Sequence, residues 1–378
     1  MELTIPKREF LRGLARTHSV ADRKSSMPLL SNILLTTDDK ATLRLAATDL
    51  YLGVTATAPA EVSTGGSVAV SARTLFDIVR ALPEGEVTWT VGANHAAEIR
   101  CGRVKYRLPG MPGDDFPPLP SPGREEFVDL DAEMLGSLVS LTQYSMSTDE
   151  TRPHLAGAFF QGEGRTVRMV TTDGHRLSKA EALVEEGTNL DFSMLVPNKG
   201  IGELKRLIED ARSERGKDDQ EPLTVGVCTA GGNAFFRREH VLLSVKLADE
   251  QFPPYGKVIP QQQQRRVVAL RARLVEALRR ISLVSNEKGG GVRLTVDEGT
   301  LRIVSENPDV GEGSEEMEVD YAGEAVTIGF NARYLLDVLG ALPDDEVALE
   351  LSGELDPGVV RPVGDQTDFV GVVMPMRI

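Results

Sequence analysis

Hydrophobic residues recur at helical spacing in two stretches that lie far apart along the chain. Residues 71–87 (SARTLFDIVRALPEGEV) and 331–347 (NARYLLDVLGALPDDEV) both place apolar side chains at positions i, i+3, i+4 and i+7. This spacing puts them on one face of an amphipathic helix. Ser71 and Asn331 stand where an N-cap residue belongs, and a proline follows each stretch. Because identical residues coincide at many matching positions, the sequence predicts the same helix twice.

A weaker third copy of this pattern lies between the other two, at residues 197–210 (PNKGIGELKRLIED). Asn198 is its expected cap, and Ile201, Leu204 and Ile208 are expected to face the core. Each copy is preceded by another segment with helical spacing; these segments are 9–18, 134–143 and 274–283. Alternating apolar and polar residues predict strands between the helices, at 87–91, 167–172 and 292–296.

Further segments recur in the same order along the chain. One set comprises 43–52, 167–177 and 301–310, and another comprises 116–120 and 252–260. The copies are spaced by roughly 125–135 residues, far more than the unit of a solenoid, so whole domains are repeated. We therefore predict three tandem α+β domains, with boundaries at 1–122, 123–260 and 261–378.

Length and composition agree with several soluble domains. A chain of 378 residues is too long for one ordinary core, and 41% hydrophobic with 26% charged residues is typical of globular proteins. Cys101 and Cys228 lie far apart and form no metal-binding motif, which predicts reduced, buried thiols. The first residues contain no apolar leader, and no apolar run is long enough to span a membrane. We expect a cytoplasmic protein.

The net charge of −15 argues against a protein that coats DNA with a basic surface, but basic residues are concentrated on helices. Arg8, Arg12 and Arg16 recur every four residues in the first helix, opposite Phe10 and Leu14. Lys199 and Lys205 belong to a basic stretch in the middle domain, and residues 265–280 contain six arginines. Either these are ordinary solvated helix faces or they form one shared basic surface. Their recurrence in each domain favours the shared surface.

Two predicted strands carry opposite charges. Residues 100–108 (RCGRVKYRL) alternate three basic with three apolar residues: Arg103, Lys105 and Arg107 with Val104, Tyr106 and Leu108. Residues 306–324 contain eight acidic residues and no lysine or arginine. Two such strands could pair head to tail between two copies of the chain. Alternatively, the charges only protect sheet edges from aggregation.

The stretch TTDGHRLS, residues 171–178, poses the question of catalysis. His175 could be a general base oriented by Asp173, as in a hydrolase of peptides or small molecules. However, the matching stretches in the other domains (ATDLYL and SENPDV) have no histidine, and no second catalytic motif accompanies it. Asp173 and Gly174 are equally suited to shaping a turn. We expect no catalytic residue, no bound metal and no cofactor.

The combination of three tandem copies, TTDGHRL, SNEK followed by GVRL, GFNARYLLDVL and VVMPMRI resembles the bacterial DNA polymerase III beta subunit, the replicative sliding clamp. The resemblance covers essentially the whole chain. It implies the DNA-clamp fold, in which each domain packs two helices on antiparallel sheets and two subunits close head to tail into a ring around duplex DNA. It also implies a processivity factor without enzymatic activity. A monomeric scaffold with this fold and no ring remains an alternative.

The resemblance also assigns candidate residues. Lys24 and Arg73 match residues near DNA, and the stripe of Arg8, Arg12 and Arg16 with Lys199 and Lys205 extends this set. The subunit interface is matched on one side by Arg103, Lys105, Tyr106 and Leu108, and on the other by Leu283, Val284, Glu315 and Glu316. Contact with double-stranded DNA would be independent of sequence.

A groove between the middle and last domains is implied as the docking site for short peptides of partner proteins. The matching positions are Arg152, Leu155, Thr172, Gly174, His175, Arg176, Leu177, Pro253, Lys257, Val258, Asn331, Tyr334, Val372, Val373, Met374, Pro375, Met376 and Arg377. Aliphatic side chains would hold a Leu or Phe, and polar groups would orient a glutamine. The implied partners are the catalytic subunit of the replicative polymerase, an ATP-driven clamp loader, and translesion and repair proteins. Gly256 and Gly289 depart from the family pattern at this groove.

Overall fold

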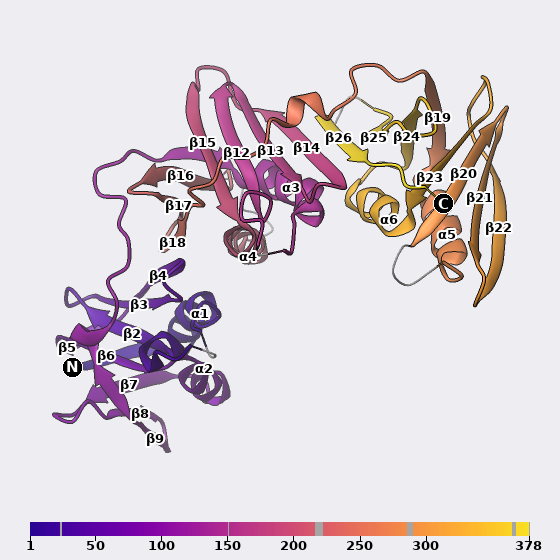
Figure 1. The fold of residues 1–378 in the computed structure, drawn as a ribbon. Coiled ribbons are helices and arrows are strands. Elements are labelled where there is room, and N and C mark those ends of the chain that lie inside the picture. Colours follow the sequence, from indigo (N-terminus) through magenta and orange to yellow (C-terminus); the bar gives the residue numbers. More distant parts are fainter. Residues whose placement is uncertain (23–24, 150, 216–221, 286–289, 365–367, 378) are drawn as a thin grey trace. The chain divides into compact units, whose positions relative to one another are not determined.

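The structure, a computed structural model, describes residues 1–378 except 23–24, 150, 216–221, 286–289, 365–367 and 378. The chain divides into two compact units: Met1–Ala132 with Gly202–Leu247, and Glu133–Ile201 with Ala248–Ile378. Each unit combines helices with antiparallel sheets (Figure 1), so the predicted α+β class is confirmed.

Two antiparallel sheets make up the described strands of the first unit. The five-stranded sheet has the order β5 (Glu61–Thr64), β1 (Glu2–Pro6), β7 (Glu86–Val91), β8 (Ala97–Cys101) and β9 (Val104–Leu108). The nine-stranded sheet has the order β10 (Gly110–Pro112), β6 (Gly66–Ser71), β2 (Asn32–Thr37), β3 (Thr42–Thr48), β4 (Leu52–Pro59), β18 (Val241–Lys246), β17 (Asn233–Arg238), β16 (Thr224–Ala230) and β11 (Val128–Asp131).

Two antiparallel sheets also make up the described strands of the second unit. The eight-stranded sheet has the order β15 (Leu190–Pro197), β12 (Gly157–Gly164), β13 (Thr166–Thr172), β14 (Arg176–Leu183), β26 (Asp368–Val373), β25 (Gly358–Pro362), β24 (Glu346–Leu351) and β19 (Arg265–Leu270). The four-stranded sheet has the order β22 (Gly311–Glu318), β21 (Thr300–Asn307), β20 (Gly291–Asp297) and β23 (Val326–Asn331).

Six α-helices occur in the described part of the chain, two in each predicted domain. They are α1 (Lys7–Thr17), α2 (Ala72–Ala81), α3 (Ala132–Thr142), α4 (Asn198–Glu214), α5 (Arg271–Ser282) and α6 (Ala332–Ala341). The apolar faces seen in the sequence are buried, including Leu75 and Val79 of α2 and Ile201 and Leu204 of α4. Burying a side chain of this size stabilises the fold by about 1.5–3 kcal/mol.

The predicted helix caps are confirmed at two of three positions. The Ser71 hydroxyl accepts a hydrogen bond from the Thr74 N–H (3.4 Å), and Asn331 Oδ1 accepts one from the Arg333 N–H (2.9 Å). The expectation for Asn198 was wrong by one position, because Asn198 is itself the first residue of α4. The cap position is taken by Pro197, the last residue of β15, whose side chain has no oxygen to accept a hydrogen bond.

Antiparallel strand pairs carry the sheets across both predicted domain junctions. At the first junction β4 pairs with β18, with Gly53 opposite Ser244. At the second junction β14 pairs with β26, with Leu177 opposite Val372. Because each pair joins strands from neighbouring domains, the compact units divide the middle domain rather than follow the three predicted boundaries.

The two strands with opposite charges both lie at sheet edges. β9 ends the five-stranded sheet, and β22 ends the four-stranded sheet (Figure 1). The prediction for residues 100–108 needs a correction, because this segment is a hairpin rather than one strand. Cys101 ends β8, Gly102 adopts a left-handed conformation (φ 57°), and Arg103 lies in the turn instead of on the basic face of β9.

The turn between β3 and β4 has the same hydrogen bonds as the turn between β13 and β14. In the first, Asp49 Oδ1 accepts from the N–H groups of Tyr51 (2.9 Å) and Leu52 (2.7 Å). The Thr48 hydroxyl donates to the Leu52 carbonyl (2.6 Å) and accepts from the Leu50 N–H (2.9 Å). An aspartate and a threonine side chain therefore fix this turn without any distant partner.

In the second turn, Asp173 Oδ1 accepts from the N–H groups of His175 (2.9 Å) and Arg176 (3.0 Å). The Thr172 hydroxyl donates to the Arg176 carbonyl (2.7 Å) and accepts from the Gly174 N–H (3.1 Å). The structural role expected for Asp173 and Gly174 is thus confirmed, and the repeat seen in the sequence extends to individual hydrogen bonds.

The residue after the aspartate is left-handed in both turns, with φ 91° at Gly174 and φ 76° at Leu50. A left-handed non-glycine residue costs about 1–2 kcal/mol, whereas glycine in the unfolded chain costs about 0.5–1 kcal/mol of entropy. Leu50 is 53% exposed and loses little packing when truncated. We therefore expect Leu50→Gly to raise the free energy of unfolding by up to about 1 kcal/mol.

This prediction is checked by urea unfolding of the full chain, followed by circular dichroism. The matched control is Gly174→Ala, whose new methyl group has room, since its nearest neighbour would be Arg152 Nη1 at 3.7 Å. The control should therefore lower the unfolding midpoint through backbone strain alone. A lower midpoint for Leu50→Gly would contradict the strain assigned to this turn.

Candidate functional site

Arg176 connects the β13–β14 turn to helix α6. Its guanidinium donates to Asp173 Oδ2 (3.0 Å), Asp337 Oδ2 (2.5 Å) and the carbonyl of Tyr144 (2.8 Å), and its Cζ lies 4.6 Å from the ring centre of Tyr334. Burial alone would lower the pKa of Arg176, but the carboxylates of Asp337 and Asp173 raise it overall. A buried arginine with two carboxylates holds these elements in one arrangement, and loss of one partner would be strongly destabilising.

His175 presents its ring to solvent beside Tyr334, at 6.3 Å between ring centres and with an interplanar angle of 17°. The carboxylate oxygens of Asp173 are bonded to backbone N–H groups and to Arg176, and none is bonded to the His175 ring. A catalytic histidine needs a partner that fixes its tautomer and orientation. Asp173 therefore serves the turn, and the hydrolase alternative loses its orienting group.

The floor of the candidate groove is aliphatic. Leu177 and Val372 are buried together with valines of β13, β25 and β26: Val170, Val359 and Val370. Phe252, Tyr255 and Ile259, from the segment after β18, pack against this cluster. The neighbouring Val373 points to the opposite face of its strand, because side chains alternate. The backbone of Val373 pairs with that of Arg176, so Val373 contributes to the sheet beneath the candidate groove rather than to its floor.

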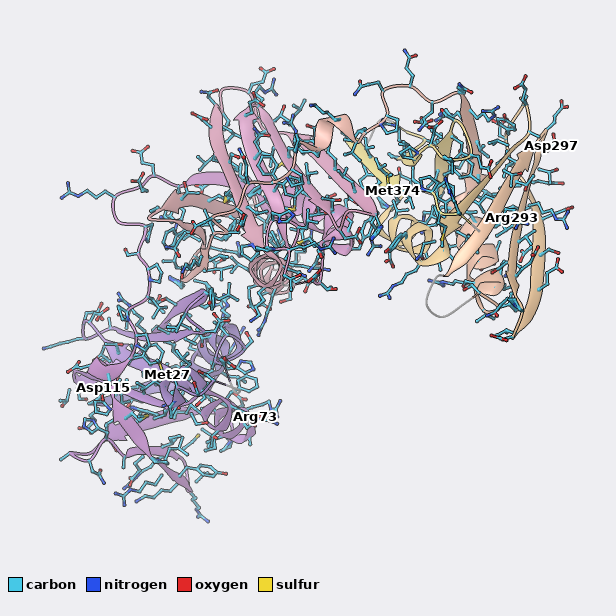
Figure 2. All side chains as sticks on the ribbon, viewed as in Figure 1. Met27, Arg73, Asp115, Arg293, Asp297 and Met374 are labelled. Atoms are coloured by element: carbon cyan, nitrogen blue, oxygen red, sulfur yellow. The ribbon has the colours of Figure 1, made fainter. Side chains whose placement is uncertain are left out.

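The chain from Met374 onward is held in place by backbone hydrogen bonds. The Met374 N–H donates to the His175 carbonyl (2.9 Å), and the Met376 N–H donates to the Gly329 carbonyl (2.9 Å). The side chain of Met374 is 39% exposed at the end of β26 (Figure 2). An apolar segment that is ordered in this way while its methionine stays partly uncovered is suited to binding another apolar group.

The remaining predicted groove residues have varied surroundings. Arg152 donates to Asp149 Oδ2 (2.9 Å) and to the Asp173 carbonyl (3.3 Å), so it supports the same turn. Leu155 and Thr172 are buried, whereas Lys257, Val258 and Arg377 are exposed. Asn331 caps α6, and Pro253 and Pro375 are half-buried. Gly289 lies outside the described residues.

The first junction has the same backbone arrangement but different side chains. There the Lys246 N–H donates to the Tyr51 carbonyl (2.8 Å), as Met374 does to His175. Gly53 and Ser244 take the places of Leu177 and Val372, and a Cβ added to Gly53 would lie 3.1 Å from Leu119. The pair that faces across the two strands is therefore small and polar at the first junction and aliphatic at the second.

The second helix of each predicted domain carries a basic residue in its first turn. The three matching positions are Arg73, Lys199 and Arg333, and all three are exposed; Arg73 is labelled on α2 in Figure 2. No acidic residue occurs in the first turn of any of these helices. A cation at this end opposes the helix dipole and costs about 0.3–1 kcal/mol, so its recurrence points to an anionic partner. Arg333 is not among the DNA-binding residues predicted from the sequence, although the repeat aligns it with Arg73.

The predicted stripe on α1 is only partly open to solvent. Arg8 is exposed, but Arg12 Nη2 lies 3.5 Å from Glu239 Oε2, and Arg16 lines a small hollow with Glu203 and Asp210. The sequence could not predict these acidic neighbours of α1, because they lie about 190 or more residues away along the chain and only the fold brings them close. Lys205 is half-buried on α4, and Lys24 lies outside the described residues.

Three of the charged residues on the edge strands already have partners of opposite charge within the chain. Lys105 Nζ lies 2.8 Å from Glu98 Oε2, and Lys105 with Arg100 lowers the pKa of Glu98. Arg280 donates to both carboxylate oxygens of Glu315 (2.9 and 2.6 Å) and thereby lowers its pKa. Glu316 lies 3.8 Å from Arg302.

Apolar groups beside these edges are left uncovered. The side chain of Tyr106 on β9 is 40% exposed, and Leu283, directly after α5, is 80% exposed. Val284 is half-buried, and a Cβ added to Gly313 on β22 would lie 3.1 Å from its Cγ2. Leu108 is buried. The edges thus combine unpaired backbone groups with uncovered apolar side chains, which is the usual composition of a protein interface.

Other kinds of site receive no support in the part of the chain that the structure describes. Among those residues, no cluster of three or more His, Cys, Asp and Glu side chains could hold a metal ion. None of the described helices is both long and apolar enough to cross a bilayer. Cys101 and Cys228 are free and buried, as predicted.

Comparison with known proteins gives a consistent result along the whole chain. Family models of the DNA polymerase III beta subunit match the N-terminal domain at residues 1–120, the central domain at 129–254 and the C-terminal domain at 256–377. The beta sliding clamps of Caulobacter vibrioides and Escherichia coli are each 34% identical to this chain, over 385 and 382 residues. Each comparison covers 100% of this chain and 100% of the relative.

Solved structures agree with this result. The DNA polymerase III subunit beta of Pseudomonas aeruginosa is 31% identical and gives a TM-score of 0.92, and a sliding clamp of Bartonella birtlesii bound to griselimycin is 32% identical and gives 0.91. Both comparisons cover 100% of each chain. The resemblance seen in the motifs is confirmed. The chain belongs to the family of the DNA polymerase III beta subunit, the beta sliding clamps.

Proposed function

We propose that two copies of this sliding clamp close head to tail into a ring around duplex DNA and keep a polymerase on its template. As a member of its family, the chain is a non-catalytic processivity factor of DNA polymerase III. The observation that carries the ring is the pair of open sheet edges, β9 and β22, which have opposite charges and lie far apart along the chain. The three repeated domains, taken as 1–122, 123–260 and 261–378, form each half of the ring.

The interface joins β9 of one copy to β22 of the other. Exposed ion pairs are worth about 0–1 kcal/mol each, and here the charged groups would have to exchange partners they already have. Ladder hydrogen bonds and burial of Leu283, Val284 and Tyr106 therefore supply most of the binding free energy. The charges of Lys105, Glu315 and their neighbours set the orientation.

Duplex DNA faces the basic helix residues. Arg73, Lys199 and Arg333 contact phosphates without reading bases, and Arg8 and Lys205 extend this surface. Contacts that are few and exposed allow the ring to slide, because each one is readily exchanged for water and salt ions. Retention on DNA then depends on closure of the ring rather than on affinity.

Partner proteins insert short peptides into the groove formed by the β14 turn, β26 and α6. Leu177, Val372 and Met374 hold an aliphatic or aromatic side chain, and the exposed His175 ring and backbone groups orient the polar part of the peptide. The replicative polymerase, a clamp loader, and translesion and repair proteins would use this one groove. A separate ATP-driven loader opens the ring.

The test of this function is retention on circular DNA. After loading onto a nicked circle with a bacterial clamp loader and ATP, the chain should stay bound through gel filtration and should leave when the circle is linearised. Leu283→Asp with Val284→Asp should sediment as a monomer and should not be retained, because two charges would be buried at the interface.

The control for this test is Leu183→Asp, which introduces a charge at another exposed leucine (71% exposed) at the end of β14 and should behave as the unchanged chain. Equal retention on circles and linear duplexes would refute topological binding. A Leu283→Asp, Val284→Asp variant that is still dimeric at low micromolar concentration would refute the interface.

The basic helix positions make a prediction about salt dependence. Replacing Arg73 and Arg333 by alanine removes two phosphate contacts per chain, and each contact contributes about 0.9 to the slope of log affinity against log salt. The slope for a linear duplex, measured by fluorescence anisotropy, should fall by about 2 per chain. Stability should change little, because the removal of two unfavourable dipole interactions offsets the loss of the exposed ion pair between Arg73 and Asp77 (3.6 Å).

The matched control is Arg44→Ala with Arg302→Ala. These two arginines also repeat between the first and last domains, but they lie on strands and pair with Asp38 (2.6 Å) and Glu316 (3.8 Å). The control changes the net charge equally and should leave the slope unchanged. Equal slopes for both double variants would show that the helix positions do not contact phosphates.

A further inference from the structure

A hollow of about 330 Å³ lies beside the predicted peptide groove. Phe159 of β12 forms one wall, and the segment Phe252–Lys257 forms the other. Its volume falls within the range of sites that hold a side chain or a small ligand. Pro253 and Lys257 belong both to this hollow and to the predicted groove, whereas Phe159 does not belong to the predicted set.

The walls of the hollow are aromatic and fixed. The rings of Phe159 and Phe252 stack with 5.3 Å between their centres, and Tyr255 meets Phe252 edge to face at 6.2 Å. All three rings pack on the valine and leucine floor of the groove and remain half-buried. Aromatic surface that is held in place and left partly uncovered is well suited to receiving another ring.

The strand register gives the position of the hollow relative to the groove. Leu177 and Val372 lie opposite each other on the groove floor, and Lys179 with Val370 forms the row two residues further along the same strands. Phe159 belongs to this second row through its pairing with Val170, which faces Lys179. The hollow is thus displaced from Leu177 by about 7 Å along the strands and by two strands, at about 4.8 Å each, across the sheet. An extended peptide spans this separation of about 12 Å in three to four residues.

The hollow is open because residue 256 has no side chain. A Cβ added to Gly256 would meet no atom within 4 Å, and the backbone there is not left-handed, so a larger residue fits without strain. The neighbouring Lys257 is exposed at the rim. An aromatic ring in the hollow would thus lie beside the exposed ammonium group of Lys257, which favours a carboxylate in the next position of the peptide.

We infer that this hollow is a specificity subsite of the groove. It takes an aromatic side chain three to four residues from the apolar anchor of a docked peptide, with an acidic residue beside it for Lys257. This inference rests on the proposed peptide-binding function and goes beyond it, because it predicts which of several peptides that share one anchor binds best. Edge or stacking contacts between rings correspond to about a two- to tenfold gain in affinity.

The experiment compares labelled peptides by fluorescence polarisation on the full chain. The core peptide carries a glutamine and a Leu–Phe anchor. Four others extend it at either end by Gly–Gly–Phe–Asp or by Gly–Gly–Gly–Ser, which are called the Phe–Asp and Gly–Ser peptides. One of the two Phe–Asp peptides should bind at least threefold more tightly than the core peptide, and the Gly–Ser peptides should not. Gly256→Leu adds a side chain at the hollow and should bring the affinities for the Phe–Asp and Gly–Ser peptides to the same value.

The matched control is Gly340→Leu on α6, another glycine at which an added Cβ would meet no atom within 4 Å, and it should retain the gain. If the core peptide binds but neither Phe–Asp extension improves its affinity, the subsite is refuted and the groove stands. A gain that persists in Gly256→Leu also refutes the subsite. If the core peptide itself does not bind, the peptide-binding function fails and the subsite with it.

Discussion

An exposed strand edge has to be paired or protected, and this constraint organises the whole chain. Where one repeated domain follows another, β4 pairs with β18 and β14 pairs with β26, so sheets continue across both junctions. The same constraint leaves β9 and β22 as open edges. In the proposed dimer, pairing of these two edges between copies would repeat what the chain already does twice internally, and three domains would form half of a closed ring.

The candidate peptide groove is a consequence of the same pairing. β14 and β26 bring Leu177 against Val372, and the turn before β14 is held to α6 by Arg176. The first junction has the same turn and the same strand register, but Gly53 faces Ser244 there. The two junctions are thus equivalent in their backbone, and the opposed side chains are aliphatic at one and small or polar at the other.

Features that depend on neighbouring residues could be predicted from the sequence. Helical spacing located the six helices, and Ser71 and Asn331 identified two caps, because capping involves residues within one turn. The Asp173 turn is equally local. Contacts between distant segments could not be predicted: Glu239 faces Arg12, and Asp337 faces Arg176, across long stretches of chain. The hairpin at residues 100–108 was also missed, because its short turn interrupts an alternation that otherwise continues.

The central claim is that β9 of one copy pairs with β22 of another, and amide hydrogen exchange tests it most directly. Exchange is followed at protein concentrations above and below the dissociation constant of the dimer. The account predicts that amides of β9 and β22 are protected only at high concentration, whereas β4, β18, β14 and β26 are protected throughout. Rapid exchange of both edges at every concentration, or concentration-dependent protection at a different surface, would contradict it.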